Sequence, residues 1–146
     1  MLAWFARLLP VGSPAPDFTL ADQDGNEITL SKLTGRNVVL VFYPGDNTRV
    51  CTRQLSEFRD ERALFSSHGT AIFGINPQGP KSHAKFREQC NLSFPLLVDR
   101  GGKIASLYHA GGRIVRRTVY VVGKDRIIRF AKRGKPDPQQ VLAVMG

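Results

Sequence analysis

The stretch YPGDNTRVCT, residues 43–52, combines residue types that could make a reactive thiol. It places Cys51, one of 2 cysteines in the chain, between a strongly apolar run and a segment with helical periodicity. The unpaired N–H groups of a first helical turn stabilise a negative charge, and so do nearby cations such as Arg49 and Arg53. The sequence therefore predicts a thiol that loses its proton readily and acts as a nucleophile.

Two further residues of this stretch fit such a site. Pro44 ends the preceding strand, stiffens the loop and can shield the sulfur from water. Thr48 lies one helical turn before Cys51, where its hydroxyl can donate to the sulfur or to an oxygen of a small polar substrate. Simpler roles exist, with Thr48 as a helix cap and Cys51 as a small buried hydrophobe. The combination P-x-x-x-T-x-x-C after a buried strand favours the catalytic interpretation.

The segments that position these residues alternate between strand and helix patterns. The turn residues Asp24 and Gly25 predict an N-terminal β-hairpin between DFTL and EITL. Continuous apolar runs predict strands buried on both faces, and helical periodicity predicts a helix over residues 51–65. The predicted strands are NVVLVFY, TAIFGIN, FPLLVD, RTVYVVG and DRIIRFA, and the other helices are GPKSHAKFREQCNL, GGKIASLYH and DPQQVLAVMG, the last capped by Asp137. This order indicates an α/β domain, a central mixed β-sheet with helices on both faces.

Composition narrows the class of protein and its surroundings. The chain has 146 residues, 42% hydrophobic and 23% charged, which is ordinary for a soluble globular protein. Two cysteines are too few for a disulfide framework and favour a reducing compartment, so we expect a cytoplasmic protein. Residues 1–10 form an apolar N-terminal extension before the domain at 11–146, and this extension is too short to span a membrane. Leu2, Phe5 and Leu9 could share one face of a short helix there.

The charge pattern and the histidines give no sign of nucleic acid, metal or cofactor. The net charge is +9, and its excess lies between Arg100 and Lys135, where Asp125 is the single acid. We interpret this segment as a solvated face with one or two functional arginines, because no nucleic-acid-reading motif accompanies it. His68, His83 and His109 lack the spacing of a metal site, and each is expected at the surface, with His83 on an exposed helix face.

The stretch PGDNTRVC resembles the peroxiredoxin active-site loop, P-x-x-x-[TS]-x-x-C, of the AhpC/TSA-like proteins. VGSPAPDFTL and CTRQLSEFRD resemble segments of the bacterioferritin-comigratory, or Q-type, subfamily. The resemblance implies a thioredoxin-like fold and a thiol-dependent peroxidase, in which Cys51 attacks hydrogen peroxide or an alkyl hydroperoxide and becomes a sulfenic acid. Thr48 would position the peroxide. Arg117, in RTVY, matches the family arginine in R-x-x-[FY] that holds the thiolate and the peroxide oxygen.

Two other residues match supporting positions of the family, and each keeps an alternative. Gln54 matches a polar residue that bonds the catalytic arginine, or is a solvated helix residue. Tyr43 matches a position where an aromatic residue often forms a wall of the pocket; alternatively, it packs in the core. Arg116, next to the matched arginine, should face away from the site because alternate strand residues face opposite sides.

The chain departs from the subfamily at two positions. Arg49 stands where most members have proline, which predicts a further stabilised thiolate or a changed peroxide preference. Ser56 stands where many members have a resolving cysteine, which leaves Cys90 as the resolving candidate or as a residue that packs against Phe86. If Cys90 does not form a disulfide with the oxidised Cys51, thioredoxin, glutaredoxin or a small thiol would reduce the sulfenic acid directly. We expect a monomer or weak dimer, and the alternative function is a peroxide-sensing redox switch or binding module without efficient turnover.

Overall fold

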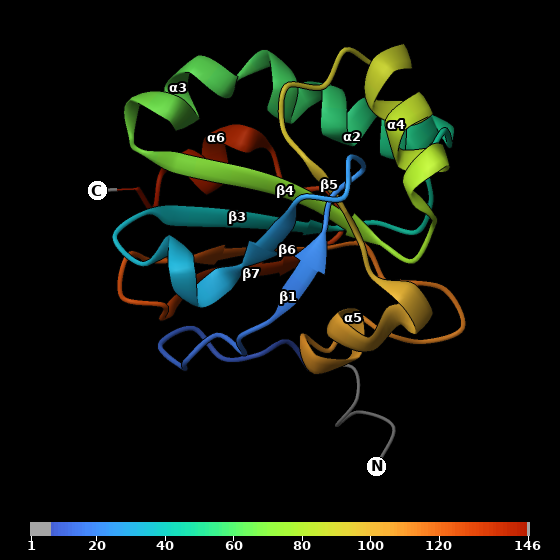
Figure 1. Cartoon of the computed structure of the whole chain (residues 1–146). Coiled ribbons are helices and arrows are strands. Elements are labelled where there is room, and N and C mark those ends of the chain that lie inside the picture. Colours follow the sequence, from blue (N-terminus) through green and yellow to red (C-terminus); the bar gives the residue numbers. More distant parts are fainter. Residues whose placement is uncertain (1–6, 146) are drawn as a thin grey trace.

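Five strands form the central sheet, in the order β5-β4-β3-β6-β7 (Figure 1). The computed structural model of the chain describes residues 7–145. The strands β3, β4 and β5 are parallel to one another, while β6 is antiparallel to both β3 and β7. The mixed sheet predicted from the sequence is therefore confirmed. Its strands are β3 (Asn37–Phe42), β4 (Thr70–Asn76), β5 (Leu96–Val98), β6 (Thr118–Val122) and β7 (Ile128–Arg133).

Helices cover both faces of this sheet, and the predicted N-terminal hairpin forms a separate two-stranded sheet (Figure 1). Side chains of β3 alternate between two cores: Val38 and Leu40 face one, and Val39 and Val41 face the other. One core is closed by the hairpin β1 (Thr19–Ala21) and β2 (Glu27–Thr29), by the 3₁₀ turn η1 (Leu30–Leu33) and by α5 (Lys103–Leu107), which directly follows a second 3₁₀ turn, η2 (Arg100–Gly102). The other is closed by α2 (Arg49–Asp60), α3 (Arg62–Ser67), α4 (Pro80–Gln89) and α6 (Pro138–Leu142).

Local capping explains where several of these helices begin. Pro80 stands at the start of α4, where its missing N–H costs nothing. Asp137 caps α6 as predicted: its carboxylate accepts from the backbone N–H of Gln139 at 3.0 Å, and Gln140 completes a capping box.

The single helix predicted over residues 51–65 is wrong in two respects. The helix begins earlier, at Arg49, and it is interrupted at Glu61, whose φ of −100° and ψ of 12° are not helical. The break turns α3 so that Phe65 packs against Phe58, with ring centroids 5.7 Å apart. Both side chains are buried, so the interruption serves packing on the sheet.

The end of the N-terminal extension packs on the domain. Leu8 and Leu9 contact the core beneath the sheet, and the Leu9 N–H donates to the Tyr120 hydroxyl at 3.1 Å. This stretch is not helical, and the other two residues of the predicted helical face, Leu2 and Phe5, lie outside the described residues. Across residues 7–145, no helix has the length and apolar character needed to cross a membrane.

The strand register brings three chain segments together at one end of the sheet. Phe42, the last residue of β3, pairs with Thr118 at the start of β6 and with Ile75 near the end of β4. The residues that follow β3 therefore meet the residue that precedes β6, which is Arg117. The sheet thus places the loop before Cys51 beside this arginine before any side-chain contact is considered.

A close contact below this loop yields a stability prediction. A Cβ atom on Gly74 would lie 2.7 Å from Cδ2 of Leu96 and 3.0 Å from Cε1 of Tyr43. We expect Gly74→Ala to lower the free energy of unfolding by about 1–3 kcal/mol through overpacking. Chemical denaturation of Gly74→Ala, Leu96→Ala and the double variant measures the coupling. The double variant should lose less than the sum of the single losses, because truncation of Leu96 makes room for the new methyl group. Additive losses would contradict the contact.

Candidate active site

Cys51 lies in the first turn of α2, where the structure buries it completely. Thr48 is the N-cap of this helix, and its Oγ1 accepts from the Cys51 backbone N–H at 3.3 Å. The capping role that the sequence left open for Thr48 is thus present. Because the hydroxyl oxygen accepts this bond, its own hydrogen stays available to donate to another group.

Arg117 reaches the sulfur from the sheet. It precedes β6 on the side of Val119 and Val121, which face the same core as Cys51. Its Nη2 donates to the Cys51 Sγ at 3.2 Å, and its Nη1 donates to the Gln54 Oε1 at 2.8 Å. Arg116, one residue earlier, is exposed, as strand alternation predicts.

Gln54 holds the arginine in this orientation. It lies one helical turn after Cys51 and is 1% exposed, so it is not a solvated helix residue. Its Nε2 has no hydrogen-bond partner within the described part of the chain. The single amide contact of Gln54 is therefore its bond to Arg117, which fixes one arm of the guanidinium while the other faces the sulfur.

Positive groups and burial act on Cys51 together. A guanidinium is charged at every working pH, and it lies in direct contact with the sulfur. The unpaired N–H groups at the start of α2 add to this positive potential. The complete burial of the sulfur acts in the opposite direction, because it disfavours a charge.

Three other residues predicted for the site, Arg49, Pro44 and Tyr43, lie outside the contact between Arg117 and Cys51. Arg49 is exposed at the first position of α2, and its side chain makes no hydrogen bond or ion pair within residues 7–145. Pro44 is half-buried and lines a small depression with Pro77 and Ile114 that does not include Cys51. Tyr43 is fully buried, its ring 6.1 Å from that of Phe86.

Cys90 is a free thiol at the C-cap of α4, and Cys51 is also free. The Cys90 carbonyl accepts a hydrogen bond from Arg59 Nη1, and the Cys90 side chain is half-buried against the core that contains Cys51. Arg59 lies eight residues after Cys51, which is about 12 Å along a helix axis. Cys90 is therefore linked to α2 through Arg59, about two helical turns after Cys51.

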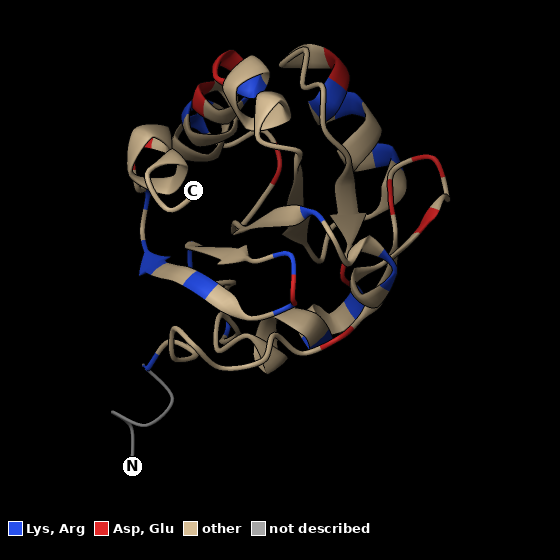
Figure 2. Cartoon of the chain, turned by 90° about the vertical axis from the view of Figure 1, so that its left-hand side faces the viewer, with Lys and Arg blue, Asp and Glu red and all other residues tan. Residues whose placement is uncertain are grey.

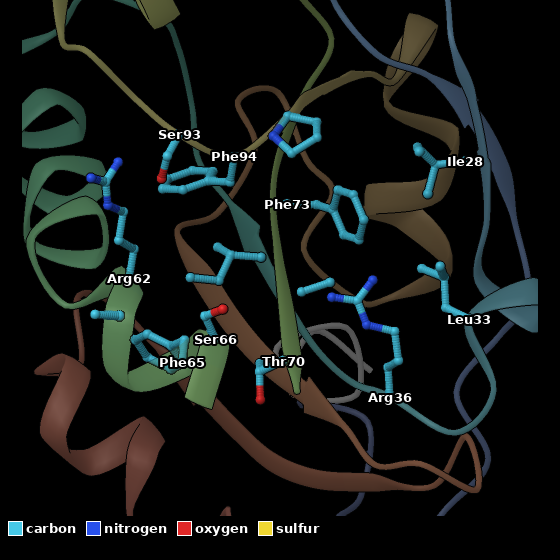
Figure 3. Close-up of a pocket in the computed structure, with 14 residues that line it drawn as sticks. Ile28, Leu33, Arg36, Arg62, Phe65, Ser66, Thr70, Phe73, Ser93 and Phe94 are labelled. Atoms are coloured by element: carbon cyan, nitrogen blue, oxygen red, sulfur yellow. The ribbon is translucent and has the colours of Figure 1, made fainter. Parts of the chain in front are cut away.

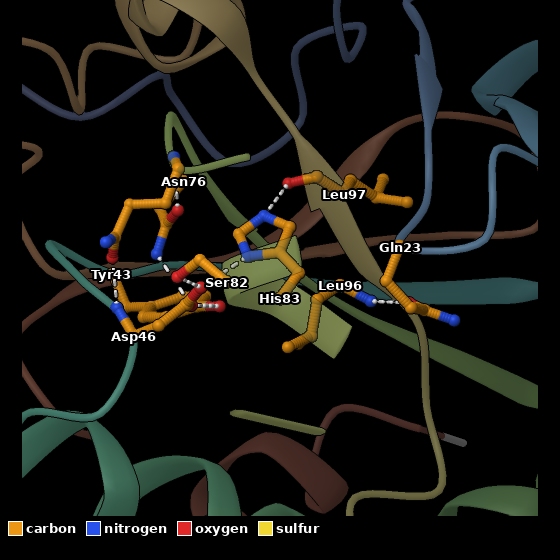
Figure 4. A network of polar contacts seen from close by, with 9 residues as sticks. Gln23, Tyr43, Asp46, Asn76, Ser82, His83, Leu96 and Leu97 are labelled. Atoms are coloured by element: carbon orange, nitrogen blue, oxygen red, sulfur yellow. Dashed lines mark hydrogen bonds and ion pairs between the residues drawn. The ribbon is translucent and has the colours of Figure 1, made fainter. Parts of the chain in front are cut away.

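Sequence reasoning missed two residues beside the site, Asp46 and His83. The prediction that His83 lies on an exposed helix face is wrong, because its side chain is 0% exposed. It lies three residues before Phe86 on the inner face of α4, and its Nδ1 is 2.7 Å from the Asp46 carboxylate (Figure 4). The signal was present: a polar residue at helical spacing from a buried Phe, and an acid in the loop before Cys51.

The basic residues of the late segment are spread over the surface and partly engaged within the chain. Figure 2 shows Lys and Arg on the helices above the sheet as well as on the late strands. Arg133 donates to Thr118 and to the His109 carbonyl, and Arg129 pairs with Asp125 at 2.6 Å. Within residues 7–145, no group of three or more His, Cys, Asp or Glu side chains could hold a metal ion.

A larger groove lies away from Cys51 (Figure 3). It follows the first half of β4, which β5 does not reach because β5 pairs only with Gly74–Asn76. Phe73 and Phe94 line it, and Arg36 and Arg62 stand on opposite sides. It contains none of the residues predicted for the site.

Comparisons with known proteins agree with this geometry. Residues 11–131 match the AhpC/TSA family. A putative peroxiredoxin bcp from Helicobacter pylori is 43% identical over 119 residues, which cover 82% of this chain and 75% of that protein. A putative chloroplastic peroxiredoxin Q from Oryza sativa subsp. indica is 38% identical over 136 residues, covering 88% of this chain and 61% of the relative. The chain thus spans about three fifths of the length of the plant relatives it matches.

Solved structures give the same result. The peroxidoxin BcpB from Mycobacterium tuberculosis has a TM-score of 0.87 at 30% identity, covering 94% of this chain and 96% of that one. Peroxiredoxin Q from Xanthomonas campestris has a TM-score of 0.83 at 23% identity, with 88% and 89% covered, and shows the fold alone. The fold is therefore thioredoxin-like, as predicted. The chain belongs to the AhpC/TSA family and, within it, groups with the peroxiredoxin Q and bcp proteins.

Asp46 gives the site a pH-dependent stability. Burial alone would raise the pKa of Asp46, but hydrogen bonds from His83, Tyr43 and Ser82 outweigh it and hold the pKa below its usual value of 3.8. As the pH falls, the unfolded chain takes up this proton first, so the stabilisation is complete above 3.8 and is lost below it.

We therefore expect the difference in unfolding free energy between the wild type and Asp46→Asn to shrink as the pH falls from about 5 to 3. Denaturant titrations across this range measure it. Asp125→Asn is the control, because the Asp125–Arg129 pair is exposed at both ends and exposed pairs contribute little. A constant difference for Asp46→Asn would contradict the assignment.

Proposed function

We propose that this protein is a thiol-dependent peroxidase that reduces hydrogen peroxide and small organic hydroperoxides through Cys51. The observation that supports this most strongly is the 3.2 Å contact from the Arg117 guanidinium to a sulfur in the first turn of a helix. A thiol in contact with a fixed cation is activated as a nucleophile. The names of the relatives, peroxiredoxin Q and bcp, support the same chemistry.

The reaction begins when the Cys51 thiolate attacks one peroxide oxygen. A sulfur–oxygen bond forms as the oxygen–oxygen bond breaks, and the sulfur is oxidised to a sulfenic acid. The second oxygen leaves with the electron pair, takes up a proton and departs as water or an alcohol. Arg117 stabilises the charge that moves from sulfur to oxygen, and the free hydroxyl hydrogen of Thr48 donates to the peroxide. Pro44 limits water at the mouth of the site.

The sulfenic acid must then be reduced by a second thiol. Cys90 is the resolving candidate within this chain, but a disulfide requires Cα atoms within about 7 Å. Cys90 is bound through its carbonyl to Arg59, and we propose that resolution by Cys90 includes local unwinding around Cys51. Otherwise thioredoxin, glutaredoxin or a small thiol reduces Cys51 directly. Such reductants place the protein in a reducing compartment, and we propose the cytoplasm.

Cysteine variants test the proposed function. Cys51→Ser should abolish peroxide consumption, because serine offers no anionic nucleophile at neutral pH, whereas Cys90→Ser should leave the first oxidation of Cys51 intact. Stopped-flow measurement of peroxide loss, with and without a thioredoxin system, separates these steps. Catalytic consumption by Cys51→Ser would exclude the proposal, and a wild type that stops after one equivalent would favour the redox switch.

Mass spectrometry of the peroxide-treated wild type assigns the second step. A Cys51–Cys90 disulfide would support resolution by Cys90. Persistent oxidation of Cys51 alone would support direct reduction by an external thiol.

Arginine variants test how the thiolate is held. Arg117→Lys keeps the positive charge but cannot contact Cys51 and Gln54 through two rigid arms. We expect the second-order rate constant with hydrogen peroxide to fall about 100-fold. Arg116→Lys, one residue away and exposed, is the matched control and should react at the wild-type rate. Equal rates for both variants would show that the guanidinium geometry is not used.

A further inference from the structure

A buried carboxylate anchors the loop that carries Pro44 and Thr48. Asp46 lies at the middle of this loop, and its side chain is 2% exposed. Its Oδ1 accepts from the Tyr43 hydroxyl at 2.7 Å and from Asn76 Nδ2 at 3.1 Å. Its Oδ2 faces the start of α4, where it accepts from Ser82 Oγ at 2.7 Å and lies 2.7 Å from His83 Nδ1 (Figure 4).

Both ring nitrogens of His83 face oxygen acceptors. Its Nε2 is 2.9 Å from the Leu97 carbonyl, which can only accept, and its Nδ1 is 2.7 Å from the Asp46 carboxylate. Both side chains of the pair are removed from water. A buried carboxylate that loses one of its hydrogen-bond donors is destabilised.

The backbone of Asp46, which leads to Cys51, is held as well. The Asp46 N–H donates to the Gln78 side chain, which ties the loop to the β4–α4 connection. Asn47 follows with φ of 64°, a left-handed conformation that its neighbours must hold in place. Thr48, the cap of α2, comes directly after it. The position of the Thr48 hydroxyl, and with it the start of the helix at Cys51, therefore depends on how firmly Asp46 is held.

Tyr43 links this anchor to the site electrostatically. Burial and then the Asp46 carboxylate, with smaller contributions from Cys51 and Cys90, raise the pKa of Tyr43 well above its usual value of 10. Tyr43 therefore stays neutral and donates to Asp46. The Tyr43 hydroxyl and His83 Nδ1 thus face the two oxygens of the same carboxylate.

We propose that His83 is a positioning residue for the peroxidase reaction: by donating from Nδ1 to Asp46, it holds the 44–48 loop, so that Thr48 and Cys51 keep their geometry. This inference rests on the proposed function. His83 does not touch the sulfur in the structure, and it acts through Asp46. The bond from Nε2 to Leu97, in contrast, belongs to the packing of α4 on β5.

Two substitutions separate these two bonds. The amide nitrogen of Asn falls near the ring position of Nδ1, so His83→Asn keeps a donor toward Asp46 and loses the bond to Leu97. The amide nitrogen of Gln falls near Nε2, so His83→Gln keeps the Leu97 bond and loses the donor to Asp46. Each variant loses one buried hydrogen bond, so thermal stability should fall in both. His68→Gln, an exposed histidine outside the site, is the control.

The test compares the rate of the first peroxide reaction with the stability of each variant, in a Cys90→Ser background. We expect the second-order rate constant with hydrogen peroxide to fall about tenfold or more in His83→Gln and less than about threefold in His83→Asn. Wild-type rates in both variants, or a loss in His83→Asn equal to or greater than that in His83→Gln, would overturn the proposal. If neither variant folds, Asp46→Asn decides: a rate within about threefold of the wild type overturns it, and a tenfold loss supports it.

A second readout distinguishes failure of this inference from failure of the proposed function. Alkylation of Cys51 by iodoacetamide reports the position and ionisation of the sulfur without any peroxide chemistry. A wild type that is alkylated but does not reduce peroxide would exclude the proposed function. The order wild type, His83→Asn, His83→Gln in alkylation rate would still support the positioning role, and equal rates would overturn it.

Discussion

The candidate site is organised around one contact, between the guanidinium of Arg117 and the sulfur of Cys51. Burial disfavours a charge on the sulfur, and a cation in contact with the sulfur favours it. That contact requires the antiparallel register of β3 and β6, which brings the residue before Thr118 next to the residue after Phe42. It also requires Gln54 to hold the second arm of the guanidinium. The register of β3 and β6, the start of α2 and the Gln54 amide therefore all contribute to the contact between Arg117 and Cys51.

Much of this arrangement follows from local sequence. The apolar run before Tyr43 predicts a strand buried on both faces, and β3 is one. Strand alternation predicts that Arg117 and Arg116 face opposite sides, and the second is exposed. Helical spacing places Gln54 one turn after Cys51, where it meets the arginine. In each case the direction of the side chain follows from the two-residue repeat of a strand or from the turn of a helix, and both repeats can be recognised in the sequence.

The features that sequence reasoning missed depend on partners distant in the chain. His83 pairs with a residue 37 positions earlier; its helical spacing from Phe86 indicates a buried position but does not identify that partner. The break in the helix at Glu61 is also not visible in the periodicity, because Phe58 and Phe65 keep the seven-residue spacing that a continuous helix would have. Periodicity predicts which face of one helix or strand is buried, but it does not predict which residues of different elements contact one another.

In the proposed reaction, the contact between Arg117 and Cys51 changes when the sulfur is oxidised. The attraction is strongest when the sulfur is an anion, and transfer of an oxygen to the sulfur consumes that anion. The Arg117 guanidinium would then keep Gln54 as a neutral partner. The proposed function therefore implies that the first turn of α2 is held to the sheet more strongly before turnover than after it.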